Sequence, residues 1–396
     1  MFTGIKRRNA EKKAKKLAEA KERKADIARR QLKTFGKVLD TTPGARGEGE
    51  LWWVKHYQWL KDCGYLLRTR YAPDWVPSWV GTNKTSQQCE DGEVPWVSHL
   101  LDATRISDGA FVILKSLKKS RHPYEAEIGE FFMTEPLASD PANHCVPIYE
   151  VLSVPEDDDR IILVMPFLRP YNDPDFDTIG EVVDCVRQLF EGLQFMHLHH
   201  VAHRDCMNLN ILMDATSLYI DPFHPFRLRR TRDLRSDARH FTRTQRPPKY
   251  YLIDFGISRR YRPSDSNPLE LPILGGDKTV PEFRDPSEPR NPFPTDVYYI
   301  GNVLREDFIQ QKVGFKFLEA LVADMVQDDP SERPTMDEVV ARFDIIRKGL
   351  SSWKLRSRVV DKQENAVSGL FRDAGHWIRH LISMAKGEPP FPTPSA

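Results

Sequence analysis

The stretch that decides the fold is His203-Arg204-Asp205-Cys206-Met207-Asn208-Leu209-Asn210, in which an aspartate is followed five residues later by an asparagine. A second motif, Asp254-Phe255-Gly256, follows the apolar run YYLI. Upstream, Val112-Ile113-Leu114-Lys115 places a lysine at the end of a predicted strand, and Glu127 falls in the helix predicted after it. The chain therefore carries a lysine, three acidic residues and an asparagine at set positions along the predicted strands, helices and loops.

Around these motifs the pattern of apolar residues changes from strand-like to helical. Residues 96–106 and 110–117 alternate and flank Ser107-Asp108-Gly109, a hairpin signal. A helix is predicted from Pro123, and two short apolar runs follow at 146–152 and 161–168. After Pro170, apolar residues recur at three- and four-residue steps, which predicts buried helices. These helices are expected at 182–196, 295–310, 314–325, 336–349 and 367–384. The fold class predicted is α+β, with a small antiparallel sheet and one helix before a larger, mostly helical part.

Five elements in this order, each on the expected type of structure, resemble a eukaryotic protein kinase. Val280-Pro281-Glu282-Phe283 resembles the family's Ala-Pro-Glu element, and two later segments, 296–301 and 329–334, resemble its Asp-led helix start and its late arginine. The resemblance covers about residues 95 to 349. It implies a bilobal fold, with an N-lobe at 95–169 and a C-lobe at 170–349 that carries an insert at 214–249. It also implies a buried ion pair between Glu282 and Arg333. The combination of arm, lead-in and insert resembles the expanded kinase-like families of fungi.

The resemblance implies transfer of the γ-phosphoryl group of Mg-ATP to a protein hydroxyl, on serine or threonine rather than tyrosine. Such a transfer depends on positioning and charge neutralisation more than on covalent chemistry. Lys115 would hold the α- and β-phosphates, kept in place by Glu127. Asp205 would accept the proton of the substrate hydroxyl, with Asn210 beside it in the catalytic set. Asn210 and Asp254 would bind Mg²⁺, which prefers oxygen ligands.

Two parts of the implied nucleotide site depend on neighbouring residues. Met165 resembles the residue that guards the adenine pocket, and Phe167 and Leu168 belong to the segment whose backbone would bind the base. The glutamate that pairs with Lys115 is less firmly assigned, because Glu125 and Glu130 lie on the same predicted helix as Glu127.

Three departures from the family pattern support a different interpretation. The stretch from Val94 to Ile106 has no glycine, although the family uses a glycine-rich turn to bring backbone N–H groups close to the phosphates. Met207 stands where serine/threonine kinases commonly have a lysine. Gly275-Gly276 occupies the region where a threonine is expected. The alternative is therefore a catalytically weak or inactive pseudokinase that acts as a binding scaffold.

The insert carries an arginine-rich segment, 226–246, with eight arginines. An arginine such as Arg243 or Arg246 would suit bidentate contact with phosphates or with an acidic substrate. The other interpretation is a solvated loop.

Charge is distributed unevenly along a chain whose net charge is only +1. Residues 1–40 hold 14 Lys+Arg against 5 Asp+Glu and form a basic arm, helical or disordered, which leaves the remaining 356 residues at −8. The arm is either a solubilising tail or a binding element for an anionic partner such as membrane or nucleic acid. In the second case the protein would be an adaptor with the kinase-like body as its scaffold.

The remaining segments flank the predicted catalytic part. A linker and aromatic-rich lead-in occupies 41–94 and contains five of the eight tryptophans, and a tail occupies 350–396. The five cysteines are spread out and form no CxxC pair, which argues against a disulfide framework or a cysteine zinc site. No transmembrane segment is predicted, and the N-terminus does not resemble a secretory signal. We expect an intracellular protein, cytoplasmic rather than nuclear, whose protein substrate and oligomeric state the sequence does not identify.

Overall fold

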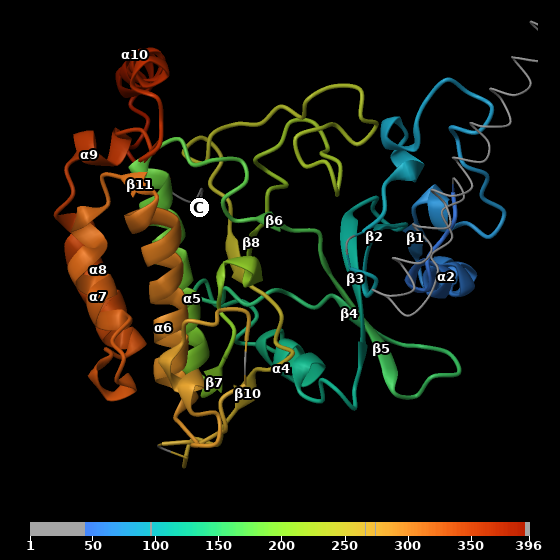
Figure 1. The fold of residues 1–396 in the computed structure, drawn as a ribbon, viewed down its shortest axis with the longest axis horizontal. Coiled ribbons are helices and arrows are strands. Elements are labelled where there is room, and N and C mark those ends of the chain that lie inside the picture. Colours follow the sequence, from blue (N-terminus) through green and yellow to red (C-terminus); the bar gives the residue numbers. More distant parts are fainter. Residues whose placement is uncertain (1–43, 96, 266, 274, 393–396) are drawn as a thin grey trace, which may run out of the picture. The chain divides into compact units, whose positions relative to one another are not determined.

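The computed structural model describes residues 44–95, 97–265, 267–273 and 275–392 (Figure 1). The basic arm predicted at 1–40 lies outside these residues. The chain divides into two compact units, one ending at Ser98 and the other starting at His99.

The first unit packs its aromatic residues around buried polar contacts. Its described residues form the helices α2 (Glu48–Lys55) and α3 (Tyr57–Asp62), the strand β1 (Tyr65–Leu67) and short 3-10 turns. Trp53 is buried and donates through its indole N–H to the carbonyl of Ser98 at 2.8 Å. The indole of Trp75 donates to the Asp91 carboxylate at 2.9 Å, and the Arg70 guanidinium lies 5.0 Å from the Trp75 ring. The aromatic lead-in thus has an internal core of its own.

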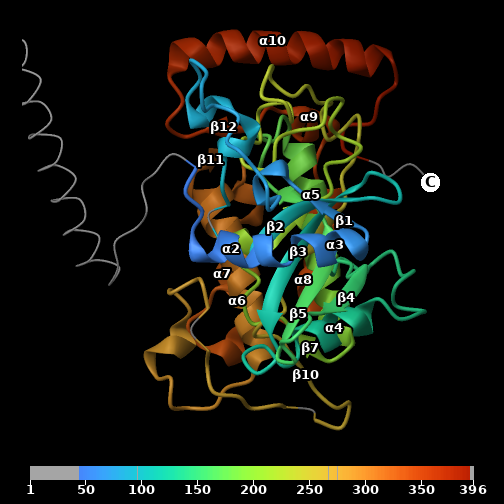
Figure 2. The same ribbon diagram turned by 90° about the vertical axis from the view of Figure 1, so that its right-hand side faces the viewer.

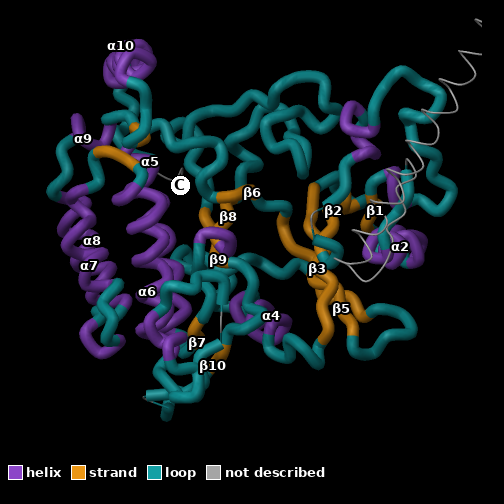
Figure 3. Tube along the Cα trace, viewed as in Figure 1, coloured by secondary structure: helices purple, strands orange, loops and turns teal. Residues whose placement is uncertain are grey.

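The second unit begins with an antiparallel sheet in the order β2-β3-β5-β4 (Figure 3). Its strands are β2 (Leu100–Arg105), β3 (Phe111–Lys118), β4 (Glu150–Ser153) and β5 (Arg160–Pro166). The predicted hairpin is confirmed: β2 and β3 are joined by a turn in which Gly109 has φ +73°, a conformation that suits glycine. The single helix predicted after the hairpin is α4 (Glu125–Phe132).

The rest of the second unit is mostly helical. Its helices are α5 (Ile179–Leu198), α6 (Pro292–Leu304), a π-helical turn (Arg305–Gln310), α7 (Glu319–Met325), α8 (Met336–Lys348), α9 (Ser352–Arg356) and α10 (Ala366–Ala385). α5 is almost wholly buried and packs against α8 and α9. The mixed α and β composition predicted from the sequence is therefore present, with strands first and helices later.

Short paired strands lie before α5, between α5 and α6, and after α6. β6 (Arg169–Pro170), β8 (Ile211–Met213) and β9 (Tyr250–Leu252) form one antiparallel sheet, and β7 (Val201–Ala202) pairs with β10 (Arg259–Arg260). β11 (Lys312–Val313) pairs with β12 (Val360–Asp361) near the C-terminal helices. These pairings hold the two sequence motifs next to each other.

The last helix lies across one end of the helical part, as the two ribbon views show (Figures 1 and 2). The amphipathic segment predicted at 367–384 is this helix, α10. None of the helices in the described parts of the chain is both long and apolar enough to cross a membrane.

Candidate functional site

Asn210 and Asp254 are brought together by the pairing of β8 with β9. Ile211 lies opposite Leu252 in this ladder, and the N–H of Ile253 donates to the carbonyl of Asn210 at 3.0 Å. Asp254 follows directly with φ +67°, a left-handed conformation that costs energy in a residue other than glycine. At this turn, 45% of the Asp254 side chain is exposed.

Lys115 joins this group from the large sheet. It lies on β3 opposite Leu100 on one side and Leu163 on the other, and it is almost fully buried. Its Nζ donates to Oδ1 of Asp254 at 2.8 Å and also to Oε1 of Glu125. One buried ammonium therefore joins residues 139 positions apart in sequence.

The partner of Lys115 is Glu125, so the pairing predicted for Glu127 is wrong. Glu125 starts α4 and is buried, whereas Glu127 and Glu130 are both exposed. On a helix, residues two apart point to different sides, so only one of Glu125 and Glu127 can face the sheet. The sequence pattern identified the helix correctly but not the face of it that meets β3.

Asp205 lies in a loop with both of its carboxylate oxygens engaged. Oδ2 accepts from Nδ2 of Asn210 at 3.0 Å, and Oδ1 accepts from the backbone N–H of Gly276 at 2.9 Å. Asn210 also donates through Nδ2 to the carbonyl of Asp205, which leaves its Oδ1 as the ligand atom. Asp205 and Asn210 are thus held as a unit, with Asn210 also joined to β9.

Side chains at residues 275 and 276 would collide with neighbouring side chains, which explains the Gly275-Gly276 pair. A Cβ at residue 275 would lie 2.6 Å from Oδ1 of Asp205, and a Cβ at residue 276 would overlap the sulfur of Met207. The glycines let the backbone approach Asp205 so that an N–H, rather than a hydroxyl, hydrogen-bonds it. The backbone N–H of Gly276 therefore bonds Asp205 in the region where a threonine was expected. Met207, in the position where a lysine was expected, packs against this glycine.

A buried aspartate fixes the backbone before Asp205. The carboxylate of Asp296, fully buried at the start of α6, accepts from the N–H groups of His203 and Arg204 at 2.7 and 2.6 Å. His203 in turn contacts the carbonyl of Ile253 at 3.0 Å through Nε2. The loop that carries Asp205 is thereby attached to both α6 and the β9 end.

The charges of the site shift the pKa values of its members. Burial would lower the pKa of Lys115, but the carboxylates of Glu125 and Asp254 raise it above its ordinary value. The surrounding protein would raise the pKa of Asp254, but the Lys115 ammonium lowers it. Burial raises the pKa of Asp205, and the negative charge of Asp254 adds to this effect. The pKa values of the two aspartates are therefore shifted in opposite directions within one site.

The residues predicted to line an adenine base lie at the end of β5. Met165 is buried and opposite Ile113 in the ladder, and Leu168 is buried as well. Phe167 is half-buried, and its N–H donates to the carbonyl of Phe111 at 3.4 Å. Met165 lies on β5, the strand next to the one that carries Lys115, and Phe167 and Leu168 follow directly after that strand.

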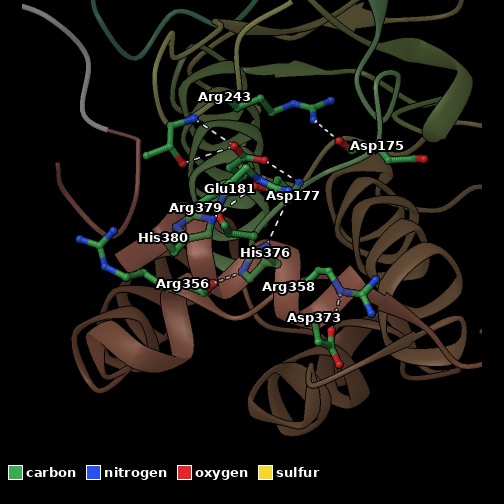
Figure 4. Close-up of polar contacts among 12 residues, drawn as sticks. Asp175, Asp177, Glu181, Arg243, Arg356, Arg358, Asp373, His376, Arg379 and His380 are labelled. Carbon is green, nitrogen blue, oxygen red and sulfur yellow. Dashed lines mark hydrogen bonds and ion pairs between the residues drawn. The ribbon is translucent and has the colours of Figure 1, made fainter. Parts of the chain in front are cut away.

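The arginine-rich insert is folded, and both interpretations are wrong for Arg243, which is neither a solvated residue nor one with a guanidinium free for phosphate. Its buried guanidinium donates to the carbonyls of Asp175, Tyr171 and Pro174 at 3.1, 3.0 and 2.6 Å. Figure 4 shows the bond to Asp175. These bonds engage the Arg243 guanidinium in holding the backbone of residues 171–175, so the guanidinium is not available to bind a phosphate. Arg246 is exposed and lies beside the Phe241 ring.

A different arginine of the insert approaches the sheet. Arg232 donates to the buried carboxylate of Asp102 on β2 at 3.0 Å, and its guanidinium lies 3.7 Å from the centre of the Phe111 ring on β3. The Phe223 ring of the insert lies 5.8 Å from that of Phe167. The insert therefore packs on the strands beside the predicted base site, a contact that composition alone does not reveal.

The predicted pair between Glu282 and Arg333 is confirmed. The two side chains make two parallel contacts of 2.7 and 2.8 Å and are 2% and 0% exposed, respectively. Thr295 also donates to Glu282 at 2.7 Å. This bidentate pair anchors the segment after Gly276 to the helical part.

Two titratable residues near the site were not predicted from the sequence. Glu270 accepts from Arg204 at 3.1 Å and so fixes the loop between Asp254 and Glu282. His99 lies within the electrostatic influence of Lys115, and burial together with that positive charge lowers the pKa of His99. His99 falls in the glycine-free stretch, where a titratable residue at the start of β2 was the available signal.

Comparison with known proteins gives no further assignment. A scan against models of protein families finds no match to this chain, and a search of curated protein sequences finds none either. The candidate function therefore depends on the residues and their geometry.

Proposed function

We propose that the second unit is a bilobal protein-kinase-like phosphotransferase that moves the γ-phosphoryl group of Mg-ATP to a protein hydroxyl, serine or threonine rather than tyrosine. The observation that carries the proposal is the position of Lys115 Nζ between Glu125 and Asp254, beside the Asp205–Asn210 pair. Phosphoryl transfer requires a cation for the phosphates, oxygen ligands for a metal and a base, all held in place before reaction.

The residues present fit a magnesium ion. Asp254 offers an exposed carboxylate with a lowered pKa, and Asn210 offers an amide oxygen whose nitrogen is already used. These hard oxygen atoms are the ligands that Mg²⁺ prefers, with phosphate oxygens and water completing its coordination. When bound, the ion would neutralise phosphate charge.

The side chains of the site then have separate tasks. Lys115 would hold the nucleotide phosphates, with Glu125 fixing its position. Asp205 would take the proton of the substrate hydroxyl, whose oxygen forms a bond to the γ-phosphorus. The bond from that phosphorus to the bridging oxygen breaks, and its electron pair leaves with ADP. Met165, Phe167 and Leu168 would line the adenine base.

A pseudokinase scaffold is the alternative, and the Met207–Gly276 contact favours it. Met207 supplies no charge to a γ-phosphate, and the Gly276 N–H occupies one oxygen of Asp205. The other oxygen accepts from Asn210 and faces the same site. Turnover, not binding, distinguishes the two functions.

The test is transfer of label from γ-labelled Mg-ATP to generic protein substrates and to the full chain itself. We expect transfer by the wild type and a fall of about 10²–10⁴-fold for Asp205→Asn, the usual contribution of a positioned base. Asp221→Asn changes a half-buried carboxylate of the insert that pairs with Arg239; it is the matched control and should not change the rate. Nucleotide binding without transfer by any of the three proteins would overturn the enzymatic proposal in favour of the scaffold.

A further inference from the structure

A cluster of three potential metal ligands lies where α10 meets the start of α5. His376 and His380 are four residues apart on α10, and both are buried. Nδ1 of His376 lies 3.3 Å from Oδ1 of Asp177, and Nε2 of His380 lies 3.3 Å from Oδ2 of the same carboxylate. One ligand atom from each side chain falls within 4.8 Å of the others (Figure 4).

The second nitrogen of His376 determines what its Nδ1 can do. Nε2 lies 2.7 Å from the carbonyl oxygen of Arg356, and a carbonyl only accepts, so Nε2 carries the hydrogen. In a neutral imidazole Nδ1 is then a bare lone pair. That lone pair faces a carboxylate oxygen, so a positive species, either a second proton or a metal ion, has to lie between them.

The distances favour a metal ion over a proton. A charge-assisted N–H···O bond is typically about 2.7–2.9 Å long, and both contacts of Asp177 are longer, at 3.3 Å. Two ligands of a tetrahedral Zn²⁺ ion, each about 2.0–2.2 Å from the metal, are about 3.4 Å apart. The two contacts thus have the length of edges in a coordination shell.

We propose that Asp177, His376 and His380 bind a Zn²⁺ ion that fastens α10 to the start of α5. Two imidazole nitrogens suit this ion, as does the Asp177 carboxylate, whose Oδ1 lies near His376 and whose Oδ2 lies near His380. The hydrogen bond from His376 to the Arg356 carbonyl is the outer contact that orients a metal-bound histidine.

A fourth ligand has a route to the ion. A cavity of about 600 Å³ adjoins the cluster, with Asp177, Gly375 and Arg379 among its lining residues. Water from this cavity can complete a four-coordinate site, and the same opening lets the ion enter.

The packing of α10 explains why a metal would be useful there. Of the α10 side chains that the structure describes, His376 and His380 are the buried ones, whereas Leu370, Phe371 and Ile378 are 70%, 76% and 61% exposed. The helix therefore gains little from apolar burial on its own unit. Beneath it, the N–H of Ile179 donates to the Ser357 carbonyl and that of Val359 to the Asp177 carbonyl, so the site joins α10 to a fixed framework.

The experiment measures zinc in untagged full-length protein grown with zinc and dialysed free of loose metal. We expect about one zinc per chain in the wild type, and at least a tenfold lower content in His376→Ala and in His380→Ala. His240→Ala removes an exposed histidine that lines the same cavity and should keep its zinc. Equal zinc content in all four proteins would overturn the proposal.

A second measurement, cobalt binding by the wild type, does not depend on whether any variant folds. Cobalt added to the metal-free wild type should produce the intense visible absorption of a tetrahedral site, and zinc should remove it. Zinc should also raise the melting temperature of metal-free wild type but not that of His380→Asn. A wild type with no bound zinc and no cobalt absorption would show that Asp177 and His376 share a proton, and the metal proposal would fall.

Discussion

At the level of single residues, the site separates side chains that look equivalent in sequence. Glu125, Glu127 and Glu130 lie on one helix, but only Glu125 is buried against Lys115. Asp205 and Asp254 are both aspartates of the site, but their pKa values shift in opposite directions because only Asp254 contacts the lysine. Position relative to one buried ammonium thus decides what each acid can do.

The two glutamates of α4 provide a matched pair of variants. Glu125→Gln removes the charge that holds Lys115, and a misplaced lysine should lower kcat/KM for ATP-dependent transfer by about 10²-fold. Glu127→Gln changes an exposed side chain and should leave the rate unaltered. Steady-state kinetics of both variants test this, and an equal effect of the two substitutions would contradict the assignment of Glu125.

The raised pKa of Asp205 has a consequence for the pH dependence of the rate. The base works only in its ionised form, so activity is lost as the pH falls through its pKa. Because burial raises that pKa above 3.8, the acid limb of the kcat/KM profile should lie at higher pH than an ordinary aspartate would give. An acid limb at or below pH 3.8 would show that Asp205 is not the titrating base.

At the level of elements, the buried Glu282–Arg333 pair holds the segment after Gly276 to the helical part. Arg333→Ala would leave a buried carboxylate without its partner, and the free energy of unfolding should fall by about 3–5 kcal/mol. Arg284→Ala breaks a pair that is 71% exposed on both sides, and should cost less than about 1 kcal/mol. Chemical denaturation of both variants measures the difference, and equal losses would contradict this role.

The insert offers a second matched pair. Arg243→Ala would leave three backbone carbonyls without their donor, and the free energy of unfolding should fall by at least about 2 kcal/mol. Arg246→Ala removes only an exposed contact with Phe241 and should change the stability by less than about 1 kcal/mol. A stable Arg243→Ala protein that has lost only activity would restore the phosphate-binding role that the buried position argues against.

Elements could be predicted from sequence more fully than the contacts between them. The β2–β3 hairpin, α4, α5 and α10 follow from local periodicity and turn residues, which act within a few positions of each other. The Glu282–Arg333 pair was predicted through a family resemblance. Glu125, the burial of Arg243 and the Asp177–His376–His380 cluster depend on which faces meet across long sequence separations, and local patterns do not report that. The spacing His376-x-x-x-His380 was visible, but its carboxylate partner lies 199 residues earlier than His376.

At the level of the whole molecule, the second unit combines two arrangements with separate purposes. One is the group around Lys115, Asp205, Asn210 and Asp254, which assembles from the sheet and the β8–β9 ladder. The other is the histidine cluster that fastens α10. A variant of one should leave the other intact, because no residue is shared between them.

Phosphotransferase activity at this site is tested by the rate of γ-phosphoryl transfer as a function of Mg²⁺ concentration for wild type, Asp205→Asn and Asp254→Asn. The account predicts that Asp254→Asn raises the Mg²⁺ concentration needed for half-maximal rate by at least about tenfold, since a charged ligand is lost. Asp205→Asn should lower the maximal rate while its Mg²⁺ dependence stays that of the wild type. A shifted Mg²⁺ dependence in Asp205→Asn, or wild-type behaviour in both variants, would contradict the account.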